Sequence, residues 1–175
     1  MTAITDGPVA GPLPGGTNTV APETFREVMT HFAASVTVVT AYDTNTPVGC
    51  TATAVFSLTD APPTMVVSLT SASSTLRHIT AAGFFAVNVL PWRLRALADR
   101  FARLSSGRRF DGVEHTDTFG APLLTGAVAG LVCRVTRLIP LADHTLVVGE
   151  VVHARAESHE DPLVHYARRQ TRPEA

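Results

Sequence analysis

Residues 36–58 have the sequence VTVVTAYDTNTPVGCTATAVFSL, and this stretch decides the fold class. Residues 36–42 are rich in β-branched side chains and predict a strand. Residues 43–47 contain aspartate, asparagine and proline, a composition typical of turns. Residues 48–58 predict a second strand, so the two strands are expected to form a hairpin.

Further strands follow on the C-terminal side of this hairpin. The proline pair at 62–63 ends the second strand, and four more strands are predicted at 65–69, 84–90, 127–140 and 144–156. Three short helices are predicted. Apolar residues at helical spacing indicate one at 23–33 and one that starts at Pro91 and continues to Phe101. Between them, a helix opens at 71–74, continues through Leu76 and Ile79 and closes near Gly83. We expect residues 105–126 to be mostly loop. Many strands with only short helices between them predict a mainly β protein, an antiparallel barrel rather than a doubly wound sheet.

The bulk composition narrows the function classes. The 175 residues fit one domain, at 23–175, preceded by a flexible tail at 1–22 that is rich in glycine and proline. Fourteen basic and fifteen acidic residues give a net charge of −1. A nearly neutral chain lacks the positive charge typical of proteins that bind nucleic acid, so we expect no nucleic-acid partner. Neither a signal peptide nor an apolar run long enough for a membrane span is recognised, so we expect a cytoplasmic protein.

Two cysteines, Cys50 and Cys133, lie in strand-like apolar stretches. We interpret them as buried thiols, because two cysteines are too few for a disulfide framework. The sequence contains no CxxC motif and no cluster of Cys and His residues, so we predict no metal site.

The first candidate site segment is Gly49–Ala54, which consists of small residues. Small side chains let a flat ligand approach the backbone, whose N–H and C=O groups can then bond the edge of a ring. The alternative is a strand pressed closely against another strand.

The second candidate is Ser68–Leu76, a strand that runs into a helix start through hydroxyl residues. Free backbone N–H groups and hydroxyls at such a start can bind a phosphate. The alternative is an ordinary helix cap, which needs only one serine.

Two further candidates are less distinctive. Asp143-His144 precedes the last long strand, where a histidine can bond a cofactor carboxamide or phosphate; a solvated turn is the alternative. Arg108-Arg109-Phe110 lies in the long loop, where the arginines can bind a pyrophosphate or form a solvated patch. A serine hydrolase is disfavoured, because no GxSxG motif is present.

In their order and spacing, these stretches resemble the flavin reductase-like family, which has the FMN-binding split-barrel fold. More narrowly, the chain resembles the small reductase component of two-component flavin monooxygenases. The resemblance extends from about Phe25 to Tyr166. It rests on residues 25–26, 35–40, 49–55, 62–63, 84–90, 101–102, 122–124, 133–135, 143–144, 149–151 and 162–163.

The resemblance implies a role for each matching segment. Cys50, Thr51, Ala52, Thr53 and Ala54 would border the isoalloxazine, and Ser68, Ser73, Ser74 and Thr75 would hold the flavin phosphate. Asn88 would lie near the ribityl or adenosine end, with Arg109 and Phe110 as further cofactor contacts. His144 would meet the nicotinamide cofactor, and Tyr166 would close over it.

The implied reaction is hydride transfer from NADH to free FAD or FMN, with reduced flavin passed to a partner monooxygenase. We favour FAD as the flavin and NADH over NADPH. The resemblance also implies a homodimer with flavin at the subunit interface. Three alternatives stay open: a non-catalytic split barrel that binds flavin or heme, an enzyme resembling pyridoxine phosphate oxidase, and a structural domain with an empty barrel.

Overall fold

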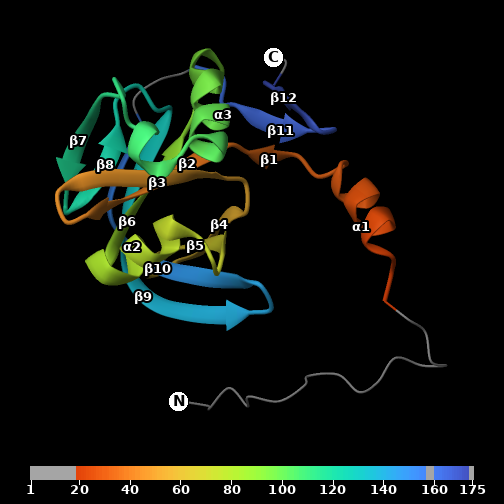
Figure 1. Ribbon diagram of the computed structural model, residues 1–175, viewed down its shortest axis with the longest axis horizontal. Coiled ribbons are helices and arrows are strands. Elements are labelled where there is room, and N and C mark those ends of the chain that lie inside the picture. Colours follow the sequence, from red (N-terminus) through yellow and green to blue (C-terminus); the bar gives the residue numbers. More distant parts are fainter. Residues whose placement is uncertain (1–18, 157–159, 174–175) are drawn as a thin grey trace.

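The computed structural model describes residues 19–156 and 160–173 (Figure 1). Within them, the helices are α1 (Pro22–Met29), α2 (Ser74–Ala82) and α3 (Arg95–Arg103), with 3-10 turns η2 (Trp92–Leu94) and η3 (Ser106–Arg108). The strands are β1 (Ala34–Ser35), β2 (Thr37–Asp43), β3 (Thr46–Ala52), β4 (Val55–Asp60), β5 (Pro63–Thr70), β6 (Phe84–Val89), β7 (His115–Thr118), β8 (Ala121–Leu124), β9 (Ala129–Leu141), β10 (His144–Ala156), β11 (Val164–Tyr166) and β12 (Arg169–Thr171).

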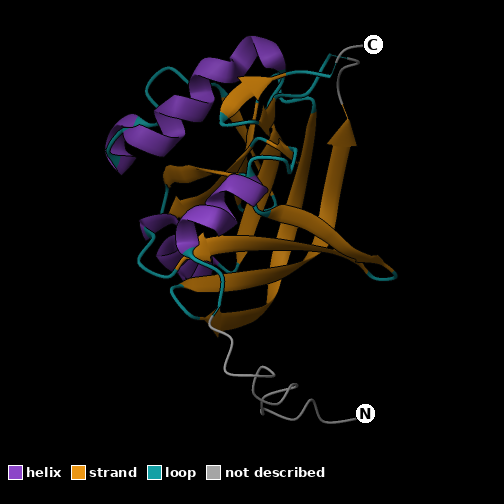
Figure 2. Cartoon of the chain, turned by 90° about the vertical axis from the view of Figure 1, so that its right-hand side faces the viewer, coloured by secondary structure: helices purple, strands orange, loops and turns teal. Residues whose placement is uncertain are grey.

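A seven-stranded antiparallel sheet dominates the fold, in the order β3-β2-β6-β9-β10-β5-β4. Its two edge strands, β3 and β4, follow one another in the chain. The sheet must therefore curl until its edges meet near Thr53 and Ala54, which gives an antiparallel barrel. Figure 2 shows the helices lying toward one side of the strands in that view. The predicted fold class is confirmed.

The strand predicted at 48–58 is in fact two strands. Residues up to Ala52 pair with β2, whereas residues from Val55 onward pair with β5. The backbone changes partner across Thr53 and Ala54, where the Ser68 N–H donates to the Ala54 carbonyl at 2.9 Å. The break could not be predicted from composition, because the residues on both sides of it are similar β-forming residues.

The region 105–126 contains more regular structure than predicted. Strands β7 and β8 form a hairpin there, and β8 is fully buried beside β6 and β2. A second small sheet joins β1, β11 and β12. These strands have two to four residues each, too few for an alternating pattern to stand out.

The barrel interior holds the main core. Phe85, Val39 and Val147 are completely buried in one cluster, together with Ile79 of α2. Helix α2 ends as predicted at Gly83, whose φ of 74° suits a left-handed C-terminal cap. The interior is therefore filled by side chains, and a ligand must bind at the rim.

Helix α1 behaves differently from the other helices. Its predicted apolar face is present, but Phe25 and Val28 are each more than half exposed, and Met29 is also exposed. Figure 1 shows the helix standing apart from the barrel. Of the predicted tail at 1–22, residues 1–18 lie outside the described residues, and Pro22 already begins α1.

Within the described ranges, none of the helices has the length and apolar character required to cross a bilayer.

Candidate functional site

Three of the predicted site segments meet at one cavity of about 310 Å³. It lies where β3 passes into β4, at the rim of the barrel. Its lining is formed by Cys50, Thr51, Ala52, Thr53, Ala54, Ser68, Leu69, Thr70, Ser73 and His144. Segments separated by up to 94 positions thus converge, because His144 opens β10 and pairs directly with Thr70 at the end of β5.

Two side-chain hydrogen bonds reinforce the wall formed by β3. The Thr37 hydroxyl donates to the Ala52 carbonyl at 2.7 Å, and the Thr51 hydroxyl donates to the Ala98 carbonyl of α3 at 2.6 Å. Gly49 must lack a side chain, since a Cβ there would lie 2.7 Å from the Val39 carbonyl oxygen. The backbone of this wall is therefore fixed before any ligand arrives.

The start of α2 forms the opposite wall and suits an anion. Ser73 is the N-cap residue, yet its side chain makes no capping hydrogen bond, so the first-turn N–H groups lack that partner. The Thr75 hydroxyl is buried and, apart from the neighbouring Cys50 thiol, has no hydrogen-bond partner among the described residues. Helix N-termini attract negative charge, so this wall fits a phosphate group.

The two cysteines are free thiols in different surroundings. Cys133 is fully buried in the core, and burial raises its pKa to about 12. Cys50 lines the cavity, and burial also raises its pKa, although the hydroxyls of Thr75 and Ser73 and the charge of Arg109 oppose the rise. Both thiols are therefore protonated at neutral pH and act as small apolar groups.

His144 lies at the cavity rim beside a carboxylate. Its Nδ1 is 2.8 Å from Oδ1 of Asp143, and the hydrogen bond to His144 lowers the pKa of the Asp143 carboxyl. A carboxylate in that position favours a proton on Nδ1. The Nε2 atom then has an in-plane lone pair for a ligand whenever the ring is neutral.

Asn88 has a structural role that the sequence did not indicate. Its side chain is fully buried; Nδ2 donates to the Val38 carbonyl at 3.0 Å and to the Thr40 hydroxyl at 3.1 Å, and Oδ1 accepts from the Leu124 N–H at 2.8 Å. The two Nδ2 bonds join β6 to β2, and the Oδ1 bond joins β6 to β8. This side chain is thus engaged in holding three strands together, and its place near the ribityl or adenosine end of a flavin stays a prediction.

Other predicted site residues lie away from the cavity lining. Ser74 and Thr75 lie in the first turn of α2, behind Ser73. Phe110 packs edge-on against Phe101 with ring centroids 5.0 Å apart. Tyr166 is exposed in β11. Their contacts with a cofactor stay predictions.

Further residues surround the site. Leu69 and Thr70, which lie in the predicted segment Ser68–Leu76 but were given no individual role, line the cavity because β5 runs along it. An adjoining groove of about 450 Å³ shares Thr53 and Ala54 and is otherwise lined by residues of α1 and by Phe32, Ala34, His165 and Arg168, among others. No local pattern marks these residues, since α1 and β11 meet only through the tertiary structure.

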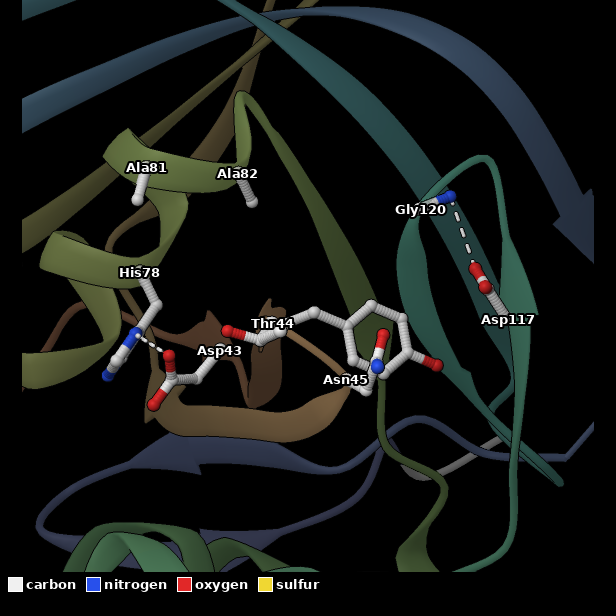
Figure 3. A pocket seen from close by; sticks show the side chains of 9 residues that line it. Asp43, Thr44, Asn45, His78, Ala81, Ala82, Asp117 and Gly120 are labelled. Atoms are coloured by element: carbon white, nitrogen blue, oxygen red, sulfur yellow. Dashed lines mark hydrogen bonds and ion pairs between the residues drawn. The ribbon is translucent and has the colours of Figure 1, made fainter.

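A larger cavity, of about 590 Å³, lies elsewhere (Figure 3). It is bounded by the β2–β3 turn, the last turn of α2 and the β7–β8 turn. Two pairs of its polar groups interact with each other: Asp43 lies 3.5 Å from Nδ1 of His78, and Asp117 accepts from the Gly120 N–H at 3.1 Å. None of the predicted site residues lines it.

Residues 29–174 match the model of the flavin reductase-like domain. The chain belongs to this family. It is 36% identical to the FMN reductase (NADH) RutF of Ancylobacter novellus, over 84% of this chain and 82% of that protein. It is 38% identical to the reductase component of the 4-nitrophenol 4-monooxygenase/4-nitrocatechol 2-monooxygenase of Rhodococcus opacus, over 81% and 76%.

The flavin reductase-like fold is also found in solved structures. The NADH:FAD oxidoreductase SgcE6 of Streptomyces globisporus C-1027 superposes with a TM-score of 0.83 at 32% identity, covering 91% of this chain and 99% of that one. The resemblance on which the sequence prediction rested is therefore confirmed over nearly the whole described chain.

Proposed function

We propose that this flavin reductase-like protein is an NAD(P)H:flavin oxidoreductase that releases reduced flavin to a partner monooxygenase. One observation carries the proposal. Segments around residues 50–54, 68–73 and 144 meet at one cavity, with small residues on one wall and a helix start on the other. That combination suits a flat ring joined to a phosphate.

The flavin ring would lie against the backbone of Thr51–Ala54. This wall ends one edge of the sheet, so its outward N–H and C=O groups have no ladder partner on that side. N–H groups there would stabilise negative charge on the ring. The phosphate would bind at Ser73 and the first turn of α2, with Ser68 nearby.

His144 would bind the nicotinamide cofactor at the rim. When both cofactors are bound side by side, they supply the hydride-transfer chemistry themselves. The chain positions the two rings and shields them from water. A catalytic acid or base is not needed for this step, and we assign none.

For the choice of flavin and nicotinamide cofactor, we keep the preferences expected from the sequence. RutF is named for FMN and NADH, and SgcE6 for NADH and FAD. We propose FAD and NADH for this chain, with FMN and NADPH as the alternatives. A cytoplasmic location fits its two free thiols.

We further propose a homodimer. The exposed residues Phe25 and Met29 of α1, together with Phe56 and Leu58 of the edge strand β4, form apolar surfaces that a single chain leaves uncovered. The groove beside α1 adjoins the flavin cavity through Thr53 and Ala54. A partner subunit seated there would complete the ligand site.

The dimer is tested by analytical ultracentrifugation of the wild type and Phe25→Glu. We expect a dimer for the wild type and a monomer with weaker flavin binding for the variant. Ala96→Glu on α3 serves as an exposed helical control. A monomeric wild type that binds flavin normally would contradict the proposed interface.

The decisive activity test is NADH oxidation in air with added FAD or FMN. Saturable turnover that depends on free flavin supports the reductase and ranks the two flavins. Absence of turnover with NADH and NADPH, in a protein that binds flavin, would instead favour a flavin-binding protein without catalysis.

A further inference from the structure

Arg109 reaches β3, the strand that forms one wall of the proposed flavin site, from a distant loop. It follows η3, between α3 and β7. Its Nη1 donates to the Gly49 carbonyl of β3 at 2.6 Å, and its Nε donates to the Leu104 carbonyl at 2.9 Å. The side chain therefore ties the loop to the strand through two backbone oxygens.

The strand that Arg109 contacts, β3, is an edge strand. β3 ends the sheet, so only β2 pairs with it along its length. The bonded carbonyl belongs to Gly49, the residue directly before Cys50, with which the cavity lining begins. A shift of β3 at this point would move the backbone against which the flavin ring is proposed to lie.

Arg109 itself does not line the cavity. Its charge is nevertheless close enough to lower the pKa of Cys50 in part. A guanidinium at this place can act in two ways: as a ligand of the flavin phosphates, as expected from the sequence, or as a clamp on the strand.

We propose that Arg109 is a positioning residue that holds β3 for the flavin ring and does not act as a phosphate ligand. This inference rests on the proposed flavin site. The two bonds to carbonyl oxygens carry it, above all the partly buried one to Gly49, because a charge-assisted hydrogen bond to a partly buried carbonyl is strong and directional.

Three flavins that share the ring but differ in phosphate content separate the two roles. Riboflavin has no phosphate, FMN has one and FAD has a pyrophosphate. For Arg109→Gln, we expect the KM of all three to rise by the same factor, about tenfold. Arg109→Lys keeps the charge and a single donor nitrogen, so it should restore part of the affinity.

Arg103→Gln is the matched control, since Arg103 is exposed at the end of α3 and its side chain pairs with the exposed Asp99 at 3.4 Å. It should leave all three KM values unchanged. Thermal unfolding of each variant is followed in parallel, because a purely structural role would lower the Tm without changing KM.

Several results would overturn the inference. A loss confined to FMN and FAD would make Arg109 a phosphate ligand, and a loss confined to FAD would make it a pyrophosphate ligand. Unchanged KM values with a lower Tm would leave only a structural role.

Flavin dissociation constants from fluorescence quenching are measured beside the kinetics. If the wild type binds flavin without oxidising NADH, the proposed reductase activity fails while the Arg109 comparison still stands on binding.

Discussion

The two cavities differ in a way that separates a candidate ligand site from a mere hollow. The larger, of about 590 Å³, is lined by turns, and two pairs of its polar groups interact with each other. The smaller, of about 310 Å³, is lined by small residues and faces a helix start without a side-chain cap. Helix α2 touches both, with its N-terminal end at the small cavity and its last turn at the large one.

The difference teaches that volume is a poor guide to function here. Unused hydrogen-bonding capacity is more informative, because a buried polar group without a partner is costly and a ligand can satisfy it. Thr75 Oγ1 comes close to such a group, because the Cys50 thiol is its one hydrogen-bonding neighbour among the described residues. The following predictions test whether the two cavities differ in this way.

The largest effect should come from filling each cavity in turn. Thr53→Trp places an indole in the small cavity and should abolish flavin binding. Asn45→Trp places the same group at the large cavity and should leave flavin binding unchanged. Flavin fluorescence quenching measures both, and normal binding by Thr53→Trp would show that the flavin site lies elsewhere.

A smaller effect is expected from the two histidines, each of which pairs with an aspartate. His144→Ala should raise the KM for NADH about fivefold, as expected for one lost hydrogen bond, with little change in flavin affinity. His78→Ala should leave both constants unchanged, since His78 lies at the large cavity. Equal KM values for both variants would remove His144 from the nicotinamide site.

The rates of thiol labelling of Cys50 and Cys133 should differ, and this difference is expected to be smaller than the preceding effects. The thiolate reacts and burial raises the pKa of Cys50, so labelling at neutral pH should be slower than for an ordinary thiol. The rate should still increase as pH rises past 9.0, the ordinary value. Bound flavin should protect Cys50, whereas Cys133, with a pKa of about 12, should not react in the folded protein.

An engineered thiol at the large cavity provides the control for this labelling. Asn45→Cys, in a Cys50→Ser background, should label quickly with or without flavin. Mass spectrometry locates the label, and flavin protection of residue 45 would connect the two cavities.

The smallest effect is expected from Asp143→Asn. Asp143 is exposed, and exposed ion pairs contribute little, so the KM for NADH should change by no more than about twofold. The hydrogen bond to His144 lowers the pKa of Asp143, so its contribution is complete above the ordinary value of 3.8 and is lost as pH falls through the lowered pKa. A pH series of KM should therefore show no Asp143-dependent step near neutrality.

Local patterns were sufficient for most of the fold. β-Branched runs, the turn at 43–47 and the glycine after α2 each depend on neighbours within a few residues, and the hairpin and α2 formed accordingly. The candidate segments at 50–54 and 68–73 were found for a similar reason, since small and hydroxyl residues clustered along the chain.

What local patterns did not reveal depended on distant partners. The resemblance implied only a place near the flavin for Asn88, and its bonds to Val38 and Leu124, which bury the side chain, came from the structure. The break at Thr53 and Ala54 arises because β3 and β4 pair with different strands.

The amino-acid sequence by itself determined that this protein is a mainly β chain with small-residue and hydroxyl segments in a given order, because side-chain shape and polarity act locally. Only the tertiary structure decided that His144 opposes Thr70 and that Arg109 reaches Gly49. Such contacts depend on strand register and on loop closure over 60 or more positions, which no local pattern encodes.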